Sequence, residues 1–194
     1  MTGETLQSVD SSAFTGGAQF RELVSAEDRM REGCALLGRG RLDEALAAFE
    51  AVIALEPDNA RAHNKRGVAL AEKGMLDEAK LEFERALALD PKYASAMSNL
   101  GNVFKEKNML DKAVESYRMA LTIDPDHATA HHNLGVVYKQ MGMIDRAVAH
   151  LKQAQRLDLR RNTAAEKPMP ARVGHYLWIV AAVLVVTYFL ILRR

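Results

Sequence analysis

The sequence predicts an all-α protein, in which an array of four helix–turn–helix units is followed by one C-terminal transmembrane helix. Two observations lead to this fold class. Residues of the same type recur at steps of 34 through the middle of the chain, and the stretch from Tyr176 to Leu192 contains no charged residue. A step of 34 residues accommodates two helices and their turns, and an uncharged stretch of this length can cross a bilayer as a helix.

Composition separates a mildly acidic body from a basic C-terminal end. The 194 residues are 48% hydrophobic and 26% charged, enough for one ordinary core and without a bias toward disorder. Residues 1–166 hold 22 Lys and Arg against 25 Asp and Glu, whereas residues 167–194 hold 4 against none. The body therefore lacks the concentrated basic stripe of a nucleic-acid-binding protein. A single cysteine, Cys34, excludes an internal disulfide and a multi-thiolate metal site.

The N-terminal residues 1–19 predict a flexible arm. They are rich in Ser, Thr and Gly, and they lack the basic start and the apolar run of a secretory signal. Residues 20–161 have apolar residues at helical spacing and contain the repeats 26–59, 60–93, 94–127 and 128–161. The recurring positions are Gly33, Gly67, Gly101 and Gly135; Ala45, Ala79, Ala113 and Ala147; and Pro57, Pro91 and Pro125, with Leu159 in place of a fourth proline.

Each unit carries the same signals in the same order. A glycine in the first helix marks the closest crossing with the second helix, because a side chain there would hold the two backbones apart. A residue that tolerates the left-handed conformation then stops the first helix, an aspartate favours the start of the second, and a proline ends it. The stop positions are Gly40, Gly74, Asn108 and Gly142.

These features resemble the tetratricopeptide repeat, most fully in the third unit, ASAMSNLGNVFKEKNMLDKAVESYRMALTIDP. The resemblance covers residues 26–161 and implies a right-handed superhelical array. In this family the first helices line a concave groove that receives an extended peptide or a helix. Departures from the family pattern give further expectations. Glu32 and Arg66 are expected to pair across a repeat junction, and the family's tryptophan position is expected to be semi-exposed. That position holds Arg29, His63, Met97 and His131.

The fourth unit is predicted to end the array. Gln155 stands where the other units have Ile53, Leu87 and Leu121, and a polar residue suits the solvent-facing end of a repeat array. We expect no further capping helix, so that residues 162–172, with two prolines, form a linker.

Residues 173–192 predict the transmembrane helix, followed by a basic tail, residues 193–194. The stretch is apolar on every face, and aromatic residues stand near both of its ends, where they favour membrane interfaces. A buried core helix and a removed sorting signal are the less favoured alternatives. The C-terminal place of this stretch predicts a tail anchor, and basic residues on the repeat side predict that the repeat domain faces the cytoplasm.

Polar side chains on the first helices are the candidate partner-binding residues. Asn99 and Asn133 hold the same place in successive units and resemble the asparagine ladder with which some members of the family hold a peptide backbone. Val68, Thr129 and Asn133 stand where the family's chaperone-tail clamp would need other residues, so that ligand is not expected. The candidate groove residues are Asn64, Lys65, Asn99, Asn102, Lys105, His132, Asn133 and Lys139.

Catalytic chemistry is not predicted. His127 and His131 are four residues apart, a spacing that can bind metal, but one precedes a helix and the other occupies a packing position, so no metal site is expected. The sequence has no phosphate-binding loop, paired catalytic carboxylates or nucleophile motif. We therefore expect no enzyme, cofactor, nucleic acid or small-molecule substrate.

The function that the sequence predicts is a membrane-anchored adaptor or scaffold that docks a protein or peptide partner at the cytoplasmic membrane surface. The alternative is a tail-anchored receptor for organelle fission or import.

Overall fold

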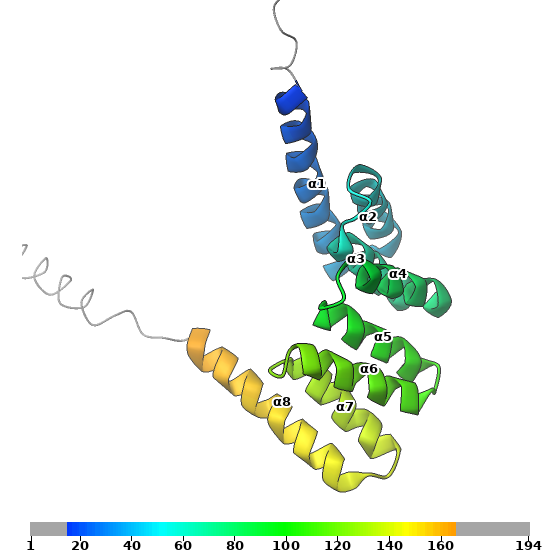
Figure 1. Ribbon diagram of the computed structural model, residues 1–194, viewed down its shortest axis with the longest axis vertical. Helices are drawn as coiled ribbons and strands as arrows, with labels where there is room; N and C mark the ends of the chain where they lie inside the picture. The colour runs from blue at the N-terminus through cyan, green and yellow to red at the C-terminus, as the bar shows by residue number, and fades with distance from the viewer. Residues whose placement is uncertain (1–14, 166–194) are drawn as a thin grey trace, which may run out of the picture.

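A computed structural model describes residues 15–165, with side chains for residues 26–163, and within this range the chain forms eight α-helices and no strand (Figure 1). The helices are α1 (Thr15–Gly38), α2 (Leu42–Leu55), α3 (Ala60–Glu72), α4 (Leu76–Leu89), α5 (Ala94–Glu106), α6 (Leu110–Ile123), α7 (Ala128–Gln140) and α8 (Ile144–Ala165).

The helices pack as four consecutive hairpins that stack on one another. Each odd-numbered helix packs against the even-numbered helix that follows it, and α2, α4 and α6 each pack against the first helix of the next hairpin. The odd-numbered helices also contact one another in a row, α1 to α3 to α5 to α7. This confirms the predicted all-α helical array, which curves along its length (Figure 1). Its right-handed superhelical sense stays a prediction.

A glycine does lie at the closest helix crossing of each unit. A Cβ atom placed on Gly101 would come within 2.7 Å of the ring of Tyr117, and one placed on Gly33 within 2.6 Å of the ring of Phe49. Tyr117 and Phe49 are fully buried, so these rings have no room to retreat. Gly67 and Gly135 face Phe83 and Leu151 in the same way.

The predicted turns are also confirmed. Gly40, Gly74 and Gly142 have φ values of 72°, 81° and 76°, and Asn108 has a φ of 56°. Asparagine is one of the few residues with a side chain that enters this left-handed region readily. The third unit can therefore make the same turn as its neighbours without a glycine.

Both ends of the array differ from the predicted limits of residues 20–161. Helix α1 begins at Thr15, and α8 continues to Ala165, past the start of the predicted linker. Leu159 explains the second difference, because a proline at the equivalent position ends each earlier unit and none is present here. The hydroxyl of Thr163 donates to the carbonyl oxygens of Leu159 and Arg160 at 2.9 and 3.1 Å within this extension.

The other part of the predicted linker, the predicted transmembrane helix 173–192 and the tail 193–194 lie outside the described residues, as do residues 1–14 of the predicted arm. Among helices α1 to α8, none combines the length and the apolar character needed to cross a membrane.

Two expectations about the second unit are wrong. Arg66 does not pair with Glu32 but donates to Glu50 on α2 and Glu82 on α4, at 2.8 and 2.9 Å. His63 is not semi-exposed but buried, with Nδ1 2.8 Å from Glu82. The reason is Glu82, whose side chain is only 6% exposed, since a buried carboxylate requires compensating donors.

The fourth unit places two histidines where the second unit has a histidine and a glutamate. His131 and His150 stand 68 residues after His63 and Glu82, and their Nδ1 atoms are 2.9 Å apart. His131 Nε2 donates to the Pro125 carbonyl oxygen at 3.1 Å, so the Nδ1 of neutral His131 accepts the proton of His150. Burial, with a contribution from His131, lowers the pKa of His150 from its ordinary value of 6.5.

Gly101→Ala is expected to destabilise the array by about 1–3 kcal/mol, because the new methyl group overlaps the buried Tyr117 ring. Gly38→Ala is the matched control: nothing lies within 4 Å of a Cβ there, so alanine should stabilise the helix by up to about 1 kcal/mol. Chemical denaturation followed by circular dichroism measures both. Equal effects of the two substitutions would show that the crossing is not tight.

Stability is expected to fall as the pH drops below about 6.5, the ordinary pKa of histidine. Because the pKa of His150 is lower in the folded chain, the unfolded chain binds more protons in this range, so acid favours unfolding. His150→Glu should weaken this dependence, since a protonated His131 would then donate to a carboxylate. The exposed His132, replaced by Asn, is the control. Thermal unfolding at pH 5 and pH 7.5 tests the idea, and an unchanged acid effect in His150→Glu would refute it.

Candidate partner-binding groove

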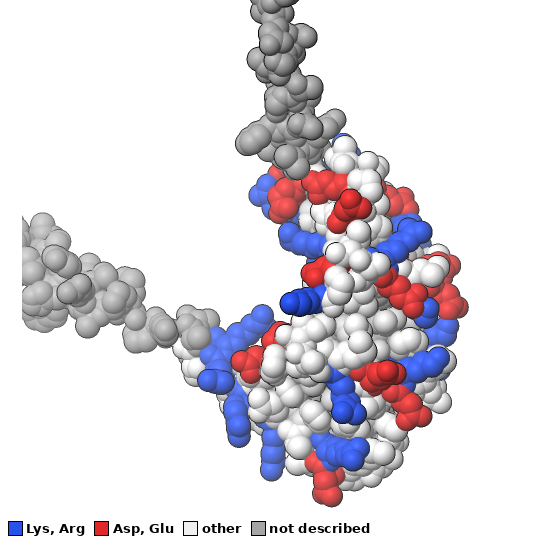
Figure 2. Space-filling model, viewed as in Figure 1, with Lys and Arg blue, Asp and Glu red and all other residues white. Residues whose placement is uncertain are grey.

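The inner side of the array is hollowed between α1 and the C-terminal part of α8 (Figure 2). All eight candidate residues predicted from the sequence lie on the first helices of units two to four. Helix α3 carries Asn64 and Lys65; α5 carries Asn99, Asn102 and Lys105; and α7 carries His132, Asn133 and Lys139.

Four asparagines join neighbouring first helices by hydrogen bonds. Asn99 Nδ2 donates to Asn64 Oδ1 at 2.9 Å, and Asn133 Nδ2 donates to Asn102 Oδ1 at 2.7 Å. Asn102 Oδ1 also accepts from the buried Tyr117 hydroxyl at 2.6 Å. The ring that packs on Gly101 thus orients an asparagine that holds the next repeat.

The predicted ladder residues therefore have a structural role that the sequence did not disclose. Asn99 and Asn133 are half-buried, and each uses one amide N–H to bind the preceding unit. Within residues 26–163, neither of their carbonyl oxygens accepts a hydrogen bond from another side chain. The two oxygens remain as acceptors for a ligand, and the proposed contact with a partner stays a prediction.

The other candidates differ in accessibility. His132 and Lys139 are exposed, whereas Lys65 is half-buried. Lys105 lies 3.1 Å from Glu106, which compensates its charge. Asn64 is only 3% exposed, and its amide donates to the Tyr93 hydroxyl at 3.2 Å. Direct contact with a ligand is most accessible to His132 and Lys139, while Asn64 acts by positioning Asn99.

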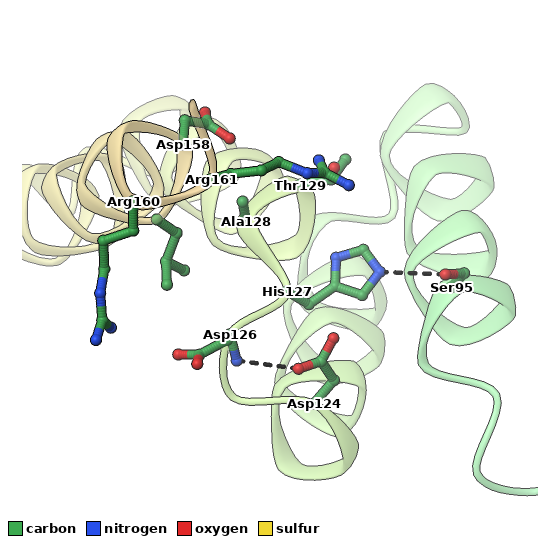
Figure 3. Close-up of a pocket in the computed structure, with 10 residues that line it drawn as sticks. Ser95, Asp124, Asp126, His127, Ala128, Thr129, Asp158, Arg160 and Arg161 are labelled. Carbon is green, nitrogen blue, oxygen red and sulfur yellow. Dashed lines mark hydrogen bonds between the residues drawn. The ribbon is translucent and has the colours of Figure 1, made fainter. Parts of the chain in front are cut away.

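A cavity of about 660 Å³ lies at the C-terminal end of the hollow, and the sequence did not predict it. The start of α5, the turn before α7 and the last turns of α8 surround it (Figure 3). Arg161 extends toward Thr129, whereas Arg160 points away from it (Figure 3). The lining residues are Ser95, Asp124, Asp126, His127, Ala128, Thr129, Leu157, Asp158, Arg160 and Arg161.

The extension of α8 creates this cavity. Arg160 and Arg161 lie beyond Leu159, the position at which each earlier unit has a proline, and Asp158 directly precedes it. Leu159 was therefore the one signal in the sequence that pointed to these residues. Two arginines and three aspartates, Asp124, Asp126 and Asp158, line the same cavity, so it suits a ligand segment with both charged and hydrogen-bonding groups.

His127 lines the cavity and caps the start of α7. Its Nδ1 accepts the Ala130 N–H at 3.2 Å and caps α7, so Nε2 carries the proton and points to Ser95 Oγ at 3.4 Å (Figure 3). His131 turns instead to His150 and Pro125. Across the described part of the chain, no group of three or more metal-ligating side chains gathers.

Comparison with family models identifies the repeats. Models described as "TPR repeat" match residues 69–108 and 101–142, and models described as "Tetratricopeptide repeat" match residues 30–82 and 128–160. Residues 30–160 are an array of tetratricopeptide repeats. Proteins with this repeat generally act as protein-binding scaffolds. No curated protein matches the chain.

Several solved structures have a similar fold. A crystal structure of MamA is 24% identical with a TM-score of 0.61, over 76% of this chain and 86% of that chain. Pseudomonas aeruginosa PilF is 24% identical with a TM-score of 0.65, over 70% of this chain and 62% of that one. The Arabidopsis OM64 TPR domain is 21% identical with a TM-score of 0.58, over 61% and 98%. At these identities the likeness concerns the fold alone.

Asn99→Ala is expected to destabilise the tetratricopeptide array by about 1–3 kcal/mol, because it leaves the buried Asn64 carbonyl oxygen without its donor. Lys139→Ala, at an exposed position of α7, should change stability by less than about 0.5 kcal/mol. Denaturation of Asn64→Ala, Asn99→Ala and the double variant gives the coupling between the two side chains. Strictly additive effects would contradict the inter-repeat bond.

Proposed function

We propose that this protein is a scaffold that holds an extended segment of a protein partner in the groove of α3, α5 and α7, next to a membrane to which residues 173–192 attach it. The observation that carries the proposal is the row of polar side chains on these helices, here called the polar strip. Hydrogen bonds from Asn99 to Asn64 and from Asn133 to Asn102 align it, and the cavity beside α8 lies at its end. The identity of the repeats supports a protein partner.

The chemistry of the strip suits an extended backbone. The carbonyl oxygens of Asn99 and Asn133 can each accept a backbone N–H, whatever side chains the partner carries. The bridges to Asn64 and Asn102 fix the orientation of both amides before a ligand arrives, which lowers the entropy cost of binding. Lys139 and Arg161 add positive charge for an acidic side chain or a terminal carboxylate.

The sequence supports the membrane part of the proposal. Residues Tyr176 to Leu192 carry no charge, and Trp178 and Tyr188 stand toward opposite ends of the stretch, as in transmembrane helices. Arg156, Arg160 and other basic residues precede it, which favours a cytoplasmic location for the repeats.

Binding is best tested with variants that do not touch the inter-repeat bonds. Lys139→Ala with Arg161→Ala should weaken recovery of a partner from detergent-solubilised membranes by about tenfold, since each exposed ion pair contributes up to roughly 1 kcal/mol. Arg118→Ala, exposed on α6 and outside the groove helices, is the matched control. Partner recovery that depends on Arg118 and not on the groove pair would contradict the proposal.

Attachment to the membrane is tested separately by alkaline carbonate extraction of membranes from cells that express the full chain. A transmembrane anchor should keep the protein in the pellet, whereas a variant with charged residues replacing Val183 and Val185 should be released. Release of the unaltered chain would contradict the anchor and leave the groove proposal intact.

A further inference from the structure

The last hairpin leaves one face of α8 uncovered within the described structure. In α2, α4 and α6 the corresponding face packs on the next unit. Apolar residues of this face join the hydrophobic core clusters: Leu46 and Ile53 on α2, Leu87 on α4, and Val114 and Leu121 on α6. Among the described helices, only α7 packs extensively against α8. Val148, the equivalent of Leu46 and Val114, is accordingly 43% exposed.

This uncovered face, here called the end face, combines apolar and basic side chains. Ile144, Val148 and Leu159 are exposed large hydrophobic residues, with exposures of 55%, 43% and 58%. Ile144 and Val148 are four residues apart, and Lys152, Gln155 and Leu159 continue the row at steps of four, three and four, so these side chains lie on one side of the helix. The end face consists of Ile144, Val148, Lys152, Gln155, Arg156, Leu159, Arg160 and Thr163.

The charge of the end face has one sign near its C-terminal end. Lys152, Arg156 and Arg160 line a shallow hollow of about 490 Å³ together with Gln155, Leu159 and Thr163, and no carboxylate contributes to it. Within residues 26–163, none of these three basic side chains forms an ion pair. Their charges are therefore available to an external anionic surface.

Charge complementarity selects the kind of surface. A second copy of the end face would bring the same basic residues into contact with one another, which is repulsive. An uncharged helix folded back from residues 173–192 would leave Lys152, Arg156 and Arg160 without counter-charges. A membrane with anionic lipids provides negative headgroups for the basic side chains and an apolar boundary for the leucine and valine, the pattern of helices that lie on membrane surfaces.

We propose that the end face of α8 docks on the surface of a membrane that contains anionic lipids. This inference rests on the proposed membrane anchor for its geometry. Residues 166–172 can span at most about 25 Å between α8 and that anchor, so the C-terminal turns of α8 stay close to the bilayer. The attraction of each basic residue acts within about 10 Å of the headgroups.

Docking would orient the groove. Leu157, Asp158 and Arg161 line the cavity from another side of α8 than Lys152, Gln155 and Arg156. A membrane against the end face therefore leaves most of the cavity wall accessible to a partner. The tetratricopeptide array would be held with a defined orientation instead of rotating about a tether.

The test uses the full chain in vesicles of phosphatidylcholine alone or with 30% phosphatidylserine. In a Cys34→Ser background, Leu159→Cys carries an environment-sensitive fluorophore, and spin-labelled lipids report its contact with the bilayer by quenching. Leu81→Cys, 57% exposed on α4, is the control site. Vesicle flotation is measured in parallel, and circular dichroism confirms that each variant is folded.

A label at residue 159, and not one at residue 81, should be quenched in anionic vesicles. Lys152→Glu, Arg156→Glu and Arg160→Glu together should lower the ratio of docked to undocked α8 by at least about a hundredfold, since each basic residue at an anionic surface changes it roughly fivefold. The matched control reverses three exposed basic residues elsewhere, Arg39, Lys92 and Arg118, with the same change in net charge.

The outcomes separate the docking inference from the anchor. Flotation with neutral vesicles but no quenching at residue 159 in anionic vesicles would overturn docking and keep the anchor. Equal quenching in the two charge-reversed variants would also overturn it. Flotation only with anionic vesicles, with quenching at residue 159, would support docking and refute the anchor. Flotation with neither kind of vesicle would refute both.

Discussion

The close packing of a ring or a leucine on a glycine, once in every repeat, is the contact on which the rest of this structure depends. Gly33, Gly67 and Gly101 each accept a fully or almost fully buried aromatic ring, and Gly135 accepts Leu151. Because this contact sets the distance between the two helices of a unit, all units have nearly the same shape. Equal units stack with equal steps, and equal steps bring asparagines on successive first helices within hydrogen-bonding distance.

While the glycine contact is the same in every unit, the pair of positions occupied by residues 63 and 82 in the second unit holds different residues in the other units. The second unit fills it with His63 and the buried Glu82, and the fourth with His131 and His150. In the third unit the same positions hold Met97 and a buried Ser116. The glycine contact tolerates this variety because it is a separate contact of the hairpin. The electrostatic properties of a unit can therefore change while its shape is kept.

The repeats were predictable because their signals are local and recur. The 34-residue step gave the units, and the left-handed turn residues, including Asn108, gave the ends of the first helices. Polar contacts were harder to predict than the repeats, as Arg66 shows. Which of Glu32, Glu50 and Glu82 pairs with Arg66 depends on side chains from three other helices. The cavity at Arg161 was not predicted, because it forms only where α8 continues past Leu159. The absence of a proline at Leu159 permits this continuation but does not show what the extended helix will contact. The hydrogen bond between Asn99 and Asn64 could not be predicted either, because it depends on the distance between neighbouring units in space, which the sequence period does not give.

A protein partner is proposed to occupy the hollow side of the array. Site-specific photocrosslinking in intact membranes tests it most directly, with a photoreactive amino acid at Thr129, which lines the cavity, or at Glu84, which is exposed on α4. We expect a crosslinked partner from residue 129 and none from residue 84. Crosslinks from residue 84 alone would contradict it and place the binding surface on the outer helices.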